Sequence, residues 1–142
     1  MNELKTSTRS LGIKKFIPGI AWFFLVLVLI CLPGSDIPTV NDWLGEIYFD
    51  KWVHVGLFAV LAFLFMLPFL RSSMEAKQKW NVILKIGLAT CIWGLTTEFI
   101  QKFFVTGRQF DLFDWSADTL GALLALLFSR WRLSRFEKFL KS

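Results

Sequence analysis

Residues able to carry out acid–base, ionic or metal chemistry gather in two places. The larger group lies between Thr97 and Gly121, in TEFIQKFFVTGRQFDLFDWSADTLG, which joins two strongly apolar segments. The smaller group opens an earlier apolar segment with Asp50, Lys51 and His54. Charges at the edge of a membrane span are costly and commonly serve a function. The candidate ligand-binding residues are Asp50, Lys51, His54, Glu98, Gln101, Arg108, Asp111, Asp114 and Asp118.

These side chains allow three kinds of chemistry. An imidazole titrates near neutrality, so His54 paired with a carboxylate would suit hydrolysis or proton relay. The candidate catalytic residues are His54, Glu98 and Asp114. A divalent cation would find oxygen ligands and one imidazole, although a single histidine argues against zinc. The candidate metal ligands are Asp50, His54, Glu98, Asp114 and Asp118.

The third interpretation is structural. A buried bridge between a carboxylate and Arg108 would act as a polar clasp that fixes the register of the helices. No nucleophile-elbow, phosphate-loop or dinucleotide-binding motif occurs in the sequence, so no particular cofactor is indicated.

Composition places the chain in a membrane. Hydrophobic residues make up 55% of 142 residues and charged residues 19%, whereas soluble domains carry about 25% charged residues. The length predicts a single domain over residues 1–142. The net charge of +5 does not indicate nucleic-acid binding, because the basic residues lie mainly in the tails and one loop. Cys31 and Cys91 lack metal-type spacing and are expected to be small buried residues.

We predict an all-α membrane protein with four transmembrane helices in a compact antiparallel bundle. Each predicted helix has the roughly 17–25 residues needed to cross a bilayer. The first is read as an uncleaved span, because no small-residue cleavage site follows it. A basic amphipathic cytoplasmic tail is expected over residues 132–142. The predicted helices cover about 16–33, 51–70, 80–104 and 113–131.

The basic residues predict the orientation. Thirteen lysines and arginines fall in or near the two tails and the loop after residue 70, against three on the other side: Lys51, Lys102 and Arg108. Both termini are therefore expected in the cytoplasm. All the candidate site residues then lie on the outer side. The first outer loop, with Asp36, Asp42 and Glu46, is long enough to close over them as a lid.

Helical spacing directs the polar residues into the bundle. Small residues let membrane helices approach closely, so a face that carries them is expected to pack against a neighbour. Carboxylates on the same faces should lie in the bundle interior. The two predicted stripes are Gly87, Cys91, Gly94, Glu98 and Gln101, and Asp114, Asp118, Gly121 and Ala125.

At these residues the chain resembles the VanZ-like family of small bacterial membrane proteins, named for a teicoplanin-resistance protein. The matching motifs are Asp50-Lys51-x-x-His54, Glu98-x-x-Gln101, and Arg108-x-Phe110-Asp111-x-x-Asp114 leading to Gly121. They span the second to fourth predicted helices. The family commonly has Asn where this chain has Asp118. The resemblance implies a cell-envelope setting and, for some members, lowered susceptibility to glycopeptides.

The leading functional hypothesis is an envelope-accessory or binding protein of the bacterial cytoplasmic membrane. Its charged outer-leaflet site would engage a lipid-linked or anionic ligand, such as a cell-wall precursor, through Lys51, Lys102 and Arg108. One alternative is an intramembrane hydrolase of a lipid-linked phosphate. Another is a small proton-coupled transporter subunit that uses Glu98 as its proton site. The bilayer is the expected partner, with another membrane protein or a second copy as further options.

Overall fold

The computed structural model describes residues 11–33 and 49–141. Within these ranges the chain forms helices and no strand, which confirms the all-α prediction there. A short 3-10 helix leads into the first α-helix, and three long helices follow. The elements are η1 (Ile13–Phe16), α1 (Ile17–Ile30), α3 (Phe49–Leu70), α4 (Ala76–Phe104) and α5 (Leu112–Lys141).

Four helical stretches are long and apolar enough to cross a membrane. A hydrocarbon core about 30 Å thick needs about 20 helical residues at a rise of 1.5 Å each. The stretches are Ile13–Ile30, Phe49–Leu70, Ala76–Phe104 and Leu112–Arg135. The four predicted membrane-length helices are therefore present.

Two helices are longer than predicted. The helix α4 begins at Ala76 rather than at residue 80, after Glu75 in the N-cap position. The helix α5 continues to Lys141, so its tenth residue beyond Trp131 is still helical. Hydropathy indicates where a helix leaves the apolar layer of a membrane, not where the helical conformation of the backbone ends. No proline or glycine interrupts residues 132–141, so the helix continues.

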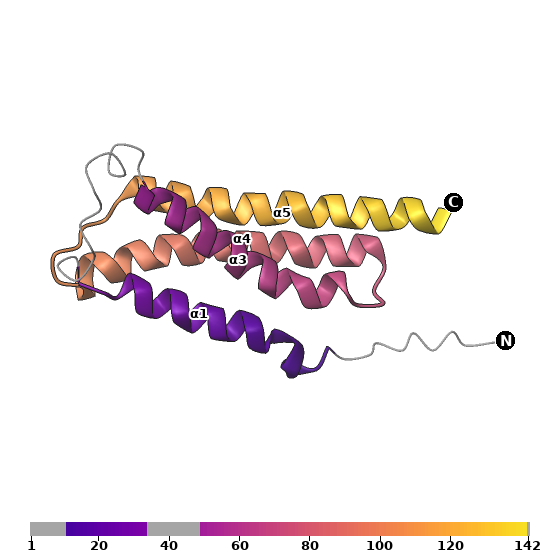
Figure 1. Ribbon diagram of the computed structural model, residues 1–142, viewed down its shortest axis with the longest axis horizontal. Coiled ribbons are helices and arrows are strands. Elements are labelled where there is room, and N and C mark those ends of the chain that lie inside the picture. The colour runs from indigo at the N-terminus through magenta and orange to yellow at the C-terminus, as the bar shows by residue number, and fades with distance from the viewer. Residues whose placement is uncertain (1–10, 34–48, 142) are drawn as a thin grey trace.

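Figure 1 shows α3, α4 and α5 side by side, with α1 lying along α3. The α3–α4 turn lies at one end of the bundle and the α4–α5 loop at the other, where α3 also begins. The helix α1 packs mainly on α3, touches α4 and does not contact α5 within the described residues. The first helix is thus peripheral to a three-helix centre.

Small residues set the closest approach between these helices. A Cβ atom on Gly121 of α5 would lie 2.8 Å from the Ala59 backbone nitrogen and closer still to the Val55 carbonyl oxygen of α3. A Cβ on Gly87 of α4 would lie 2.8 Å from a methyl group of Leu126. Only glycine fits at the Gly121 crossing, where the close atoms belong to the backbone, whereas at Gly87 the Leu126 methyl group would have to move. The predicted packing role of both glycine-bearing stripes therefore agrees with the structure.

Apolar side chains fill the bundle away from the polar end. One buried cluster joins α3, α4 and α5, and a second joins α1 to α3. The Trp22 indole of α1 also donates a 3.0 Å hydrogen bond to the Leu57 carbonyl oxygen of α3. The clusters are Ala62, Met66, Ile83, Ala122, Ala125 and Leu133, and Val26, Ile30, Phe58 and Leu61.

Candidate functional site

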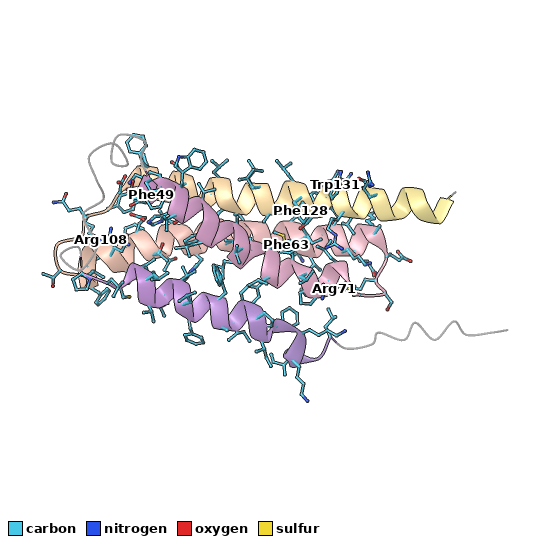
Figure 2. All side chains as sticks on the ribbon, viewed as in Figure 1. Phe49, Phe63, Arg71, Arg108, Phe128 and Trp131 are labelled. Atoms are coloured by element: carbon cyan, nitrogen blue, oxygen red, sulfur yellow. The ribbon has the colours of Figure 1, made fainter. Side chains whose placement is uncertain are left out.

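The polar groups meet where α3 begins and the α4–α5 loop turns back. Figure 2 places Phe49 and Arg108 at this end of the bundle and Arg71 at the opposite end. The predicted convergence of residues remote in sequence is therefore present. The contacts of the individual residues show how the cluster is held together, beginning with Lys51.

Lys51, in the first turn of α3, binds three carboxylates. Its Nζ lies 2.6 Å from Asp111 Oδ2, 2.6 Å from Asp114 Oδ1 and 3.0 Å from Asp50 Oδ2. Charge-assisted contacts of this length are among the stronger hydrogen bonds in proteins. Because the ammonium group is surrounded by carboxylates, Lys51 is not free to bind an anionic ligand. It instead clamps the start of α3 to the start of α5.

Asp111 organises the start of α5. Its Oδ1 accepts a 2.8 Å hydrogen bond from the Phe113 backbone N–H, as an N-cap residue does. Its own backbone N–H donates to Glu98 Oε2 at 2.8 Å, which ties the loop to α4. The neighbouring Lys51 ammonium, which hydrogen-bonds to the carboxylate, holds the pKa of Asp111 below its ordinary value. Asp111 therefore links all three central helices.

His54 lies one turn beyond Lys51 and pairs with a fully buried carboxylate. Its Nδ1 lies 2.9 Å from Asp118 Oδ1, and its Nε2 lies 3.9 Å from Asp114 Oδ1. The Asp118 carboxylate rests on α4, since a Cβ on Gly94 would lie 3.0 Å from its Oδ2. With Nδ1 as donor to Asp118, the Nε2 atom is left to accept a proton. This is the orientation that a general base requires.

Two carboxylate oxygens in this cluster have no hydrogen-bond partner among the residues that the structure describes. They are Glu98 Oε1 and Asp118 Oδ2, and both side chains are completely buried. Glu98 makes no ion pair with any described residue, so the predicted Glu98–Arg108 bridge is absent from that part of the chain. A buried carboxyl group that lacks a cation is a place where a proton or ligand can be exchanged.

The other predicted residues lie around this cluster. Gln101 is buried and its Nε2 donates a 3.3 Å hydrogen bond to the Ile30 carbonyl oxygen, at the end of α1. Arg108 is half-buried in the α4–α5 loop, and its Nε atom is shielded from solvent without an acceptor within residues 11–33 and 49–141. Lys102 is exposed, with its Nζ 5.4 Å from the centre of the Phe103 ring. Gln101 therefore ties α4 to the end of α1, whereas Arg108 Nε has no acceptor in the described part of the chain.

The geometry gives little support to a metal centre. Among residues 11–33 and 49–141, no group of three or more histidine, cysteine, aspartate or glutamate side chains is arranged to hold a metal ion. The metal hypothesis stays a prediction, as does proton transport through Glu98. The proposed lid with Asp36, Asp42 and Glu46 lies outside the described residues.

Three roles were missed by sequence reasoning. The Asp111-x-x-Asp114 spacing before an apolar helix is an N-terminal capping signal, which predicts the helix start that the structure has. The stripe containing Gly94 predicted close packing, but not that the glycine supports Asp118. The indole of Trp115 donates to the Cys91 carbonyl oxygen at 3.1 Å, which ties α5 to α4. No local pattern indicates that contact.

Comparisons with known proteins identify one curated relative. The chain is 40% identical over 90 residues to uncharacterized protein C11E3.10 of the fission yeast Schizosaccharomyces pombe. The match covers 63% of this chain and 52% of the relative, so the chain spans about half the length of the curated relative it matches. No protein-family model matches the chain, and no solved structure matches it. The VanZ-like resemblance therefore stays a prediction, and the relative's name carries no function.

Proposed function

We propose that the chain is a multi-pass membrane protein of the VanZ-like type that binds an anionic, lipid-linked ligand at the end of its bundle where α4 meets α5. In this proposal the four helices cross the bilayer in alternating directions, with both termini in the cytoplasm and the polar end outside. The thirteen-to-three distribution of basic residues supports that orientation.

Arg108 carries the proposal. Lys51 has its charge satisfied by three carboxylates, whereas the half-buried Arg108 has a shielded Nε without an acceptor among the described residues. A guanidinium group presents several N–H donors in a planar fork that matches phosphate or carboxylate oxygens. A phosphate head group would supply the missing acceptor. Lys51, Asp111 and Glu98 would act indirectly, by holding the loop that presents Arg108.

The ligand is best defined by chemistry that bacterial and eukaryotic membranes share. The fission-yeast relative makes a phosphate-bearing lipid a broader hypothesis than a bacterial cell-wall precursor. A setting in the bacterial envelope and an effect on teicoplanin susceptibility belong to the proposal through the VanZ-like motifs alone.

Charge reversal tests this proposal. Arg108→Glu should weaken binding of an anionic phospholipid to the purified protein in detergent at least about tenfold, because a charge-assisted hydrogen bond becomes a repulsion. Lys77→Glu is the matched control, since Lys77 is an exposed lysine beside the α3–α4 turn at the opposite end. Equal binding by the wild-type protein and Arg108→Glu would refute the proposal.

The His54–Asp118 pair favours a second candidate, a hydrolase of a lipid-linked phosphate. Asp118 fixes the imidazole, and His54 Nε2 could take a proton from an attacking water. His54→Ala should then abolish phosphate release while binding through Arg108 is retained. Purified protein that releases no phosphate from a panel of lipid phosphates, with and without divalent cations, would exclude this activity for those substrates.

A further inference from the structure

An apolar groove lies between α1, α3 and α4, away from the polar cluster. Its volume is about 240 Å³. It opens to the outside at the exposed Ala89 of α4. Its other lining residues are Phe23, Leu61, Phe65, Ile86, Thr90 and Trp93.

We propose that this groove holds one ester-linked acyl chain of the anionic lipid whose phosphate Arg108 binds. The inference rests on the proposed function for the head group, but the groove itself is a separate feature. It assigns the hydrocarbon part of the ligand to residues outside the predicted site.

The position of the groove identifies its surroundings. All three helices that line it are long and apolar enough to cross a membrane. At the depth of a membrane span the medium outside Ala89 is hydrocarbon rather than water. The side chains that line an apolar groove gain dispersion contacts when a hydrocarbon chain lies against them. A lipid chain entering sideways between α1 and α4 would supply those contacts.

The indole N–H of Trp93 needs a hydrogen-bond acceptor, which a hydrocarbon chain does not supply. Its indole Nε1 is shielded and has no acceptor in the described chain. By contrast, Trp22 and Trp115 each donate to a backbone carbonyl oxygen. Phe23 packs against the Trp93 ring with the ring centres 4.7 Å apart, which fixes the indole at the groove. An ester carbonyl oxygen would be a suitable acceptor, and a hydrocarbon chain by itself offers none.

The order of these features along α4 matches the order of groups in a phospholipid. Trp93 precedes Glu98 by five residues, or about 7.5 Å along the helix axis, and Ile86 lies about 10 Å farther from the polar end. The α4–α5 loop meets α4 at two levels: the Arg108 backbone N–H binds the Val105 carbonyl oxygen beyond the end of α4, and the Asp111 backbone N–H binds Glu98. Arg108, Trp93 and Ile86 therefore follow one another from the polar end in the order of phosphate, ester and acyl chain.

Filling the groove provides the test. Ala89→Phe would occupy the mouth with the protein's own hydrocarbon, whereas Leu88→Phe changes an adjacent side chain that is 64% exposed. Binding of dioleoyl phosphatidylglycerol and of dioleoylglycerol, which lacks the phosphate, would be measured in detergent by native mass spectrometry. Ala89→Phe should weaken both at least about tenfold, with Leu88→Phe within about twofold of wild type. Unchanged binding by Ala89→Phe would overturn the proposal.

The two lipids separate this inference from the proposed function. Arg108→Glu should weaken only the lipid that carries the phosphate. If Arg108→Glu has no effect while Ala89→Phe weakens both lipids, the groove inference stands and the head-group assignment fails. If Arg108→Glu weakens binding of the lipid that carries the phosphate while Ala89→Phe weakens binding of neither lipid, the groove inference fails and the head-group assignment stands.

Trp93→Phe tests the ester directly. This variant should weaken binding of the diacyl lipid about threefold to tenfold, which is the effect of one lost hydrogen bond. Binding of a dialkyl ether analogue should be unchanged. Equal losses for the ester and ether lipids would contradict the role of the N–H group. Tighter binding of a prenyl phosphate than of the diacyl lipid would overturn the acyl assignment. Retention of the wild-type melting temperature by each variant would confirm that folding is intact.

Discussion

The two ends of this helix bundle differ in whether their described basic side chains form ion pairs. At the α4–α5 end, Lys51 and His54 pair with carboxylates from other parts of the chain, across α3 and α5. At the other end, basic side chains lie over aromatic rings. The Arg130 guanidinium is 4.8 Å from the centre of the Trp80 ring, and that of Arg135 is 5.4 Å from Trp131.

The ion pairs fix the side chains at the α4–α5 end in one arrangement, whereas the arginines at the other end can change partners. Buried ion pairs specify one arrangement, since a charge left without its partner in the interior is costly. An arginine that lies over a tryptophan ring keeps N–H donors available for other partners. None of Arg71, Arg130, Arg132 and Arg135 forms an ion pair within the described residues. Function that depends on geometry is therefore expected at the α4–α5 end.

Removing Lys51 should be the most damaging change. Lys51→Met leaves three carboxylates without their cation and should lower the free energy of unfolding by about 2–3 kcal/mol, between the values for surface and fully buried pairs. Lys102→Met is the matched control, because Lys102 is exposed and makes no ion pair among the described residues. Unfolding in mixed micelles would measure both.

The double variant sharpens this prediction. Adding Asp114→Asn to Lys51→Met removes one of the unpaired charges, so the combined loss should be smaller than the sum of the two single losses. Strict additivity would show that Lys51 and Asp114 do not interact energetically.

Gly94 should rank second, because it supports the buried Asp118. In Gly94→Ala the new methyl group would lie 2.9 Å from Asp118 Cβ and 3.0 Å from Oδ2. Overpacking of this kind costs about 1–3 kcal/mol. Gly56→Ala on α3 is the control, because nothing lies within 4 Å of its added Cβ. That variant should be stabilised by up to about 1 kcal/mol through helix propensity. Equal melting temperatures for the two variants would contradict the supporting role.

The sequence predicted helices and convergence better than it predicted partners. Long apolar segments and glycine spacing depend on local chemistry, so the four helices and the Gly121 crossing could be read from the sequence. Which cation meets which carboxylate depends on helix rotation to within a fraction of a turn. Hence the sequence did not indicate that Lys51 clamps α3 to α5. Nor did it indicate that Gln101 binds the end of α1.

The smallest of these effects should come from the cap at the start of α5. Asp111→Ala removes the acceptor for the Phe113 N–H and should cost about 1 kcal/mol, a typical N-cap loss. Asp50→Ala is the control, since Asp50 also contacts Lys51 but its side chain is 63% exposed. It should cost about 0.5 kcal/mol or less. Equal losses would show that Lys51 pairing, rather than capping, explains the role of Asp111.

The dependence of stability on pH provides a second test of the role of Asp111. The pKa of Asp111 is lower in the folded protein than in the unfolded chain. Its contribution to the free energy of unfolding is therefore fully present above the pKa that Asp111 has in the unfolded chain, and it is lost as the pH falls through the pKa that Asp111 has in the folded protein. Wild-type stability should therefore decline below about pH 4, and Asp111→Ala should lack part of that decline. Parallel declines in the two proteins would assign the acid sensitivity to other carboxylates. A shallower decline in Asp111→Ala alone would identify the Asp111 carboxylate as the charge that joins Lys51 of α3 to the start of α5.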